Sequence, residues 1–120
     1  MDMNIPLLCI TLGFIVLDLV TGIVKAVYAK NGDSTKMRQG LYHKLAFIIA
    51  MALGYLCEIG ITYGAFEYAG IDLTVPISPF ICGFIILTEL ASILENLGDI
   101  NPELKNGKLI GLFGKGNEKQ

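Results

Sequence analysis

Charged residues are scarce in this chain, and the residue pairings that support catalysis are missing from it. Only 17% of its 120 residues are charged, while 53% are hydrophobic. The single histidine, His43, has no serine or cysteine beside it, and no phosphate-binding loop occurs. We therefore expect a protein that is not an enzyme and needs no cofactor, with His43 as an ordinary solvated residue.

Metal sites, disulfides and nucleic-acid binding are also poorly supported. Cys9, Cys57 and Cys82 stand alone, without the paired spacing of a metal site or a disulfide framework, so we expect small apolar space-fillers. The net charge is only −2, and no dense basic run is available to bind nucleic acid. The high hydrophobic content instead indicates a membrane protein.

Three apolar stretches dominate the chain. Residues 5–29, 45–66 and 75–97 each exceed the ~20 residues that a helix needs to cross about 30 Å of hydrocarbon. A β-barrel would need alternating segments of about ten residues, and runs such as "LAFIIAMAL" do not alternate. The sequence predicts an all-α integral membrane protein of one domain, residues 1–120, with three transmembrane helices and a polar tail at 98–120.

Helix-terminating residues fit these three spans. Asn4 and Thr74 are candidate N-caps, each followed by a proline in the first helical turn, and Gly98 with Pro102 is expected to end the third span. The flank "MDMN" contains no lysine or arginine, unlike the start of a secretory signal. We therefore expect the first stretch to be a mature span.

Basic residues lie on one side of the predicted spans. The N-terminus and the link "EYAGID" contain none, whereas the link 30–44 and the tail contain Lys30, Lys36, Arg38, Lys44, Lys105, Lys108, Lys115 and Lys119. Positively charged segments stay in the cytoplasm. The expected orientation is N-terminus outside and C-terminus inside.

Each predicted span contains one deep acid. Asp18, Glu58 and Glu89 all fall within ~6 Å of the membrane midplane at 1.5 Å per residue. Inserting an ionised carboxylate costs about 2.5–3.5 kcal/mol, and protonating an aspartate at pH 7 costs about 4 kcal/mol. These costs are too similar to decide whether the acids are ionised.

Small and polar residues recur at steps of three or four in each span and form one stripe per helix. The stripes are Asp18, Thr21, Gly22, Lys25 and Ala29 in the first span, Ala46, Ala50, Gly54 and Glu58 in the second, and Ser78, Cys82, Glu89, Ser92 and Asn96 in the third.

Two interpretations of these stripes remain open. In one, a three-helix bundle packs closely and its acids pair within the chain, with Lys25 or Lys44. In the other, the polar faces meet between subunits or line water in an oligomer. The second is favoured because three helices bury little interior and three polar stripes are more than such a bundle requires. The candidate pore or interface residues are Asp18, Thr21, Gly22, Lys25, Gly54, Glu58, Glu89, Ser92, Glu95 and Asn96.

Three segments carry a resemblance to a known family. "LDLVTGIVKA" at 17–26, "GDSTKMRQGLYHKLAF" at 32–47 and "TELASILENLG" at 88–98 resemble, in order, the signature regions of phage holins of the toxin-secretion and phage-lysis type. The third segment, with Glu89, Ser92, Ile93, Glu95 and Asn96, is the most specific. The tail, "DINPELKNGKLIGLFGKG", departs from the glycine and Pro-Lys-rich lead of that pattern.

The resemblance implies a function and its partners. Such holins accumulate in the cytoplasmic membrane of the host bacterium, form homo-oligomers within the lipid and open lesions at a programmed time. An endolysin or a toxin crosses through these lesions. The topology that the resemblance implies, three spans with the N-terminus outside, agrees with the count of basic residues.

Two other classes of function remain open. A small proton-coupled transporter or ion channel would use the deep acids to exchange protons, although no aromatic residues flank them as in a drug pocket. A passive membrane anchor would need no deep acids at all.

The stripe of the first span generates a test. Asp18→Leu is expected to insert into the membrane and to delay or abolish lysis, because it removes the acid from the polar face. Timed lysis of an expression strain measures this effect. Lysis on the normal schedule would mean that the stripe serves only the packing of helices.

Overall fold

The computed structural model of the chain describes residues 4–30, 32–73 and 75–105, and every regular element in those ranges is an α-helix. The long helices are α1 (Ile5–Tyr28), α2 (Ser34–Thr62) and α4 (Ile77–Ile100), and the short ones are α3 (Ala65–Tyr68) and α5 (Pro102–Lys105). All three long helices are apolar and long enough to cross a membrane. The prediction of an all-α protein with three such helices is confirmed.

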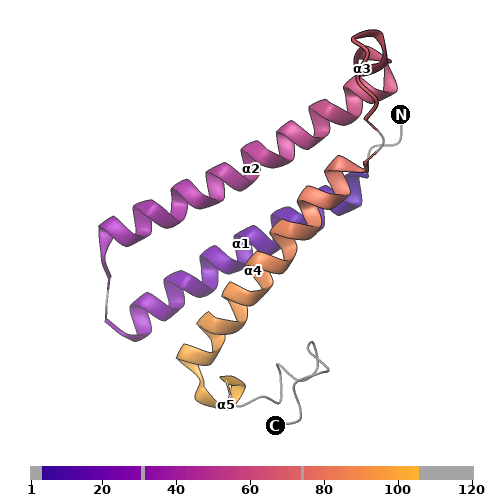
Figure 1. Cartoon of the computed structure of the whole chain (residues 1–120). Coiled ribbons are helices and arrows are strands. Elements are labelled where there is room, and N and C mark those ends of the chain that lie inside the picture. Colours follow the sequence, from indigo (N-terminus) through magenta and orange to yellow (C-terminus); the bar gives the residue numbers. More distant parts are fainter. Residues whose placement is uncertain (1–3, 31, 74, 106–120) are drawn as a thin grey trace.

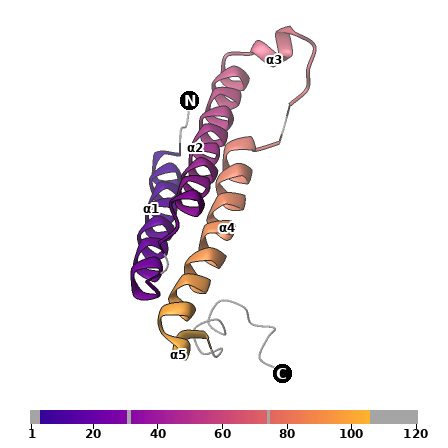
Figure 2. The ribbon, with the colours of Figure 1, turned by 90° about the vertical axis from the view of Figure 1, so that its left-hand side faces the viewer.

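The three long helices lie side by side (Figures 1 and 2). α1 and α4 run in the same direction and α2 runs in the opposite one, so the turn between α1 and α2 lies at the same end as α5. α4 packs against both α1 and α2, whereas α1 and α2 have little contact with each other. The last of the three long helices, α4, therefore holds the bundle together.

The start of α1 follows the predicted capping. The Asn4 side chain accepts a hydrogen bond from the Leu7 backbone N–H at 3.0 Å, and Pro6 lies in the first turn, where its missing N–H leaves no helical bond unmade. Thr74, the other predicted N-cap, lies outside the described residues. Pro76 occupies the N-cap position of α4.

The second helix begins well before the predicted span. It starts at Ser34 rather than at residue 45, because the Asp33 side chain accepts a hydrogen bond from the Thr35 backbone N–H at 3.0 Å and no proline interrupts the chain beyond it. It ends at Thr62, short of the predicted residue 66, just before Gly64 adopts a φ of 76°. Most of the predicted polar link 30–44 is therefore helix, and Lys44 lies about 15 Å along it.

The last long helix runs past its predicted end. Gly98 is buried inside α4, and the helix stops at Ile100, with Asn101 in an extended conformation and Pro102 following. Of the predicted stop, Gly98 with Pro102, the Gly98 part is wrong and the Pro102 part is confirmed. A glycine costs a helix only about 1 kcal/mol, whereas a proline disfavours the helical conformation of the residue before it.

The interior of the bundle is more polar than its outside. The buried hydrophobic residues are Ile15, Met51, Cys82, Ile85 and Ile93, and the buried polar ones are Thr11, Asp18, Thr21, Ser78, Glu89 and Asn96. Large apolar side chains, including Val16, Val20, Phe80, Phe84 and Leu87, are exposed. A soluble protein has the opposite distribution, whereas lipid accepts such a surface. Cys82, with no exposed surface, fills apolar space as expected.

At Gly54, α2 packs so closely against α4 that little room remains for a side chain. A Cβ atom there would lie 3.1 Å from Ile81 Cδ1 and 3.3 Å from Ser78 Cα, while a Cβ at Gly13 would meet nothing within 4 Å. Gly54, a small residue of the predicted second stripe, therefore serves packing between two helices of one chain.

We expect Gly54→Leu to destabilise the bundle by about 1–3 kcal/mol, because the new side chain has no room between α2 and α4. Gly13→Leu, on an open surface of α1, is the matched control and should unfold like the wild type. Thermal unfolding in detergent, followed by circular dichroism, measures both. Equal melting temperatures of the two variants would contradict the tight contact.

Candidate functional site

Three charged side chains, one from each long helix, meet inside the bundle. Lys44 Nζ lies 2.6 Å from Asp18 Oδ2 and 3.2 Å from Glu89 Oε2. The side chains of Asp18, Lys44 and Glu89 are 10%, 14% and 3% exposed. We refer to these three residues as the ion cluster.

The ion cluster lies near the middle of the helices that form it. Asp18 and Glu89 are each within ~3 Å of the midpoints of α1 and α4 along the helix axes, and Lys44 is about 6 Å from the midpoint of α2, towards the α1–α2 turn. The long aliphatic stem of Lys44 brings its ammonium group to both acids. The bundle therefore has its charges at its centre, far from both ends.

Neutral polar groups complete the surroundings of Asp18. Asn96 Nδ2 donates to Asp18 Oδ1 at 3.0 Å and to Thr21 Oγ1 at 3.0 Å, and the Thr21 hydroxyl donates to the Asp18 carbonyl at 3.1 Å. Both carboxylate oxygens of Asp18 therefore have partners. Within the described residues, no buried side-chain nitrogen or oxygen lacks a hydrogen bond.

The charges of the ion cluster do not balance when all three groups are ionised. Two carboxylates share one ammonium group, so the cluster has a charge of −1, and binding of one proton makes it neutral. Desolvating these ions is costly, and a close ion pair with additional hydrogen bonds offsets that cost. Loss of Lys44 would leave two acids without their counter-ion inside the bundle.

Within a single chain, the structure shows the partners of the acids in the predicted stripes. The second interpretation, contacts between subunits, stays a prediction. Asp18 and Glu89 pair with Lys44 of the same chain, as the first interpretation proposed. Lys25 pairs instead with Asp99 at 3.0 Å, near the ends of α1 and α4, where both side chains are partly exposed.

Glu58 pairs with neither lysine. Its Oε2 accepts a hydrogen bond from the backbone N–H of Ser78 at 3.3 Å, in the first turn of α4. Helix N-termini have unbonded N–H groups and a partial positive charge, so a carboxylate is favourable there. Glu58 therefore holds the C-terminal part of α2 to the start of α4, close to Gly54.

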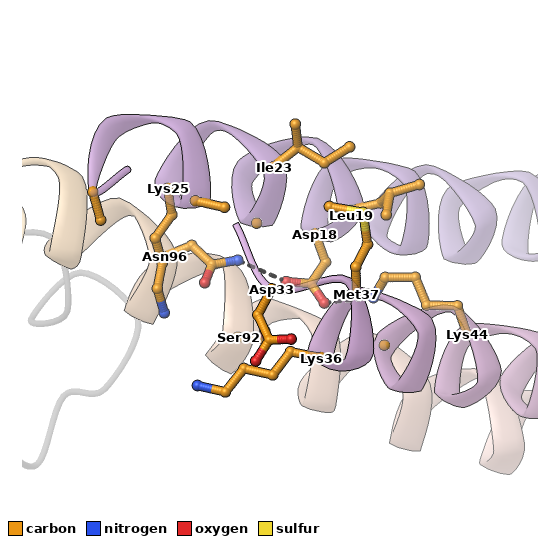
Figure 3. Close-up of a pocket in the computed structure, with 14 residues that line it drawn as sticks. Asp18, Leu19, Ile23, Lys25, Asp33, Lys36, Met37, Lys44, Ser92 and Asn96 are labelled. Carbon is orange, nitrogen blue, oxygen red and sulfur yellow. Dashed lines mark hydrogen bonds and ion pairs between the residues drawn. The ribbon is translucent and has the colours of Figure 1, made fainter. Parts of the chain in front are cut away.

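The remaining candidates lie around a pocket or on the outside. A pocket of about 340 Å³ lies between the three helices on the α1–α2 turn side of the ion cluster (Figure 3). Gly22, Lys25 and Ser92 line it, together with Asp18 and Asn96. Glu95 is exposed on the outer face of α4.

Two contributors to the polar interior belong neither to the predicted stripes nor to the candidate list. The sequence places Lys44 in the polar link, because its deep position depends on the early start of α2. Thr11 is fully buried, and its hydroxyl donates to the Leu7 carbonyl at 2.7 Å. Its spacing of seven residues from Asp18, two helical turns, could have placed it on the same face.

Together, the fold and the ion cluster define a small membrane protein with three apolar helices around a polar centre. A family model described as "Bacteriophage holin family" matches residues 4–109. The chain therefore belongs to the bacteriophage holin family. No curated protein and no solved structure matches it.

We expect Lys44→Met to lower the free energy of unfolding by about 3–5 kcal/mol, because it leaves two buried acids without a counter-ion. Lys25→Met is the matched control: its partly exposed pair contributes about 1 kcal/mol or less. Unfolding in mixed detergent micelles measures both variants.

Removing all three charges should restore much of this stability. Asp18→Asn and Glu89→Gln combined with Lys44→Met leave no uncompensated charge while retaining similar side-chain shapes. If Lys44→Met and Lys25→Met were equally stable, the central role of Lys44 would be refuted.

Proposed function

We propose that this protein is a holin that oligomerises in the cytoplasmic membrane of a bacterium and opens lesions through which an endolysin or a toxin crosses. The proposal rests on one combination: membership of the holin family together with a polar interior inside three lipid-compatible helices. The polar side chains that would line an aqueous opening are already present, in the interior of each subunit. It acts without catalysis.

The proposed orientation has the N-terminus outside and the α1–α2 turn in the cytoplasm. Lys44 is part of the bundle interior and no longer counts towards the charge bias. Lys30, Lys36 and Arg38 remain at the turn end, the end that also contains α5, while α3 at the opposite end contains no basic residue. This distribution favours the turn end as the cytoplasmic one.

The size of the cargo requires many subunits. An enzyme of ~150 residues has a radius of gyration near 15 Å and needs an opening of about 40 Å. Helices about 10 Å wide would line such an opening in a ring of roughly fifteen. One chain provides three long helices, so the function depends on assembly.

Two features of the bundle suit it for assembly. α1 and α2 have little contact, so the bundle is incompletely closed on that side. Glu95 lies exposed on α4, and among the described residues no ion-pair partner contacts it. An acid on the outer face of a membrane helix is favourable only near the headgroups or against another polar surface. We propose Glu95 as a contact between subunits.

A proton-coupled channel or transporter is the second candidate. The observation that favours it is the ion cluster, which can bind a proton, at the floor of a pocket. The two functions differ in what crosses the membrane: ions alone, or ions and folded enzymes together.

Inducible expression in a bacterium separates the candidates. For a holin, membrane potential should collapse abruptly and a cytoplasmic enzyme should appear in the medium at the same time. Glu95→Gln should delay this release, and Glu67→Gln, the same change at an exposed site in α3 outside the long helices, should not. Ion leak without enzyme release would refute the holin proposal in favour of a channel, and harmless accumulation would favour an anchor.

A further inference from the structure

The pocket beside the ion cluster extends in only one direction. All of its lining residues lie between the ion cluster and the α1–α2 turn: those of α1 run from Asp18 to Ala29, those of α2 end at Lys44, and α4 contributes Ser92 and Asn96. Asp33 and Lys36, both exposed, are lining residues beside the α1–α2 turn. Figure 3 shows the hydrogen bond that joins Asp18 and Asn96, two of its lining residues.

The opposite side of the ion cluster is closed by apolar packing. Ile15, Met51, Cys82 and Ile85 form a buried hydrophobic core, and each lies on its helix towards the α3 end relative to the ion cluster. Phe47 and Ile81 pack against this core. Beyond it, Gly54 lies against Ser78. A water molecule has no polar partner inside this core, so such a region stays dry.

The pocket itself meets the physical requirements for water. Its volume of about 340 Å³ has room for on the order of ten water molecules at ~30 Å³ each. Polar atoms of Asp18, Ser92 and Asn96 line it at depth, and Lys25 lines it nearer the turn. Hydrocarbon in the same space would solvate none of these groups.

We propose that this pocket is a one-sided aqueous vestibule, which connects the ion cluster with the solution on the side of the α1–α2 turn and ends at the apolar core. Its ligands are water, protons and small hydrophilic solutes. Protons that bind to Asp18 or Glu89, the two acids that face Lys44, come from that side alone. The inference depends on the three membrane spans and not on lesion formation.

Gly22 is a suitable position for a chemical probe. A Cβ atom there would point towards Asn96 and lie 3.7 Å from its Nδ2, an ordinary contact, so a cysteine fits at the pocket wall. Val20 and Val24 flank Gly22 at nearly the same depth, are each 47% exposed, and do not line the pocket. They are matched controls on the lipid-facing surface.

The experiment uses the full chain, with Cys9, Cys57 and Cys82 replaced by alanine, in sealed membrane vesicles of both orientations. Gly22→Cys should react with a membrane-impermeant methanethiosulfonate at least about tenfold faster from the turn side than from the other side, because a thiol ionises and reacts in water. Val20→Cys and Val24→Cys should react at least about tenfold more slowly than Gly22→Cys from the turn side. Ala26→Cys, also on the pocket wall, replaces Gly22→Cys if that variant does not accumulate.

Two marker variants make the outcomes separable. Gly32→Cys lies at the turn and Tyr68→Cys in α3, at opposite ends of the bundle, and both positions are exposed. In sealed vesicles, each variant should react from one side only. Reaction of both markers from the same side would refute the three-span arrangement and with it the proposed function.

If the two markers react from opposite sides, the reaction rates of Gly22→Cys alone test the vestibule. Equal rates for Gly22→Cys and its valine-site controls would mean that lipid or another helix fills the pocket, and would overturn the vestibule. Reaction of Gly22→Cys from the α3 side, or equally from both sides, would overturn its one-sidedness.

Discussion

The sharing of the Lys44 ammonium group between Asp18 and Glu89 is the interaction on which this bundle depends. Its two ion pairs tie α2 to both other long helices. α1 and α2 have little direct contact, so their relative position is set largely through α4 and through this lysine. In hydrocarbon, where apolar contact gives no advantage over lipid, polar contacts and close packing decide how helices associate.

The distribution of polarity explains how one sequence can suit both lipid and the aqueous lesion proposed for it. Within each subunit the carboxyl, hydroxyl and amide groups satisfy one another, so lipid meets mainly apolar side chains. An assembly in which the helices separate would need water or other subunits to replace these partners. The same polar groups that hold the single subunit together are therefore those available to line an opening.

Sequence patterns predicted the helices and the polar faces, because hydrophobic length and helical spacing are local properties. Asp18, Thr21, Glu89 and Asn96 were recognised as members of one polar face per helix, and the structure buries all four. Sequence patterns could not tell whether Lys25 or Lys44 pairs with the acids. This pairing depends on where α2 begins and on the rotation of each helix. The contact of Glu58 with the start of α4 is a tertiary feature without a local signal.

The position of Glu89 and Asn96 on α4 has a consequence for motion within the membrane. The two residues are seven positions apart, two turns on the same face, and both reach Asp18 or its counter-ion. Displacing α4 by one residue along its own groove would turn that face by about 100° and advance it by about 1.5 Å. Both contacts would then be lost together, so the charged centre fixes the register and the rotation of α4 at the same time.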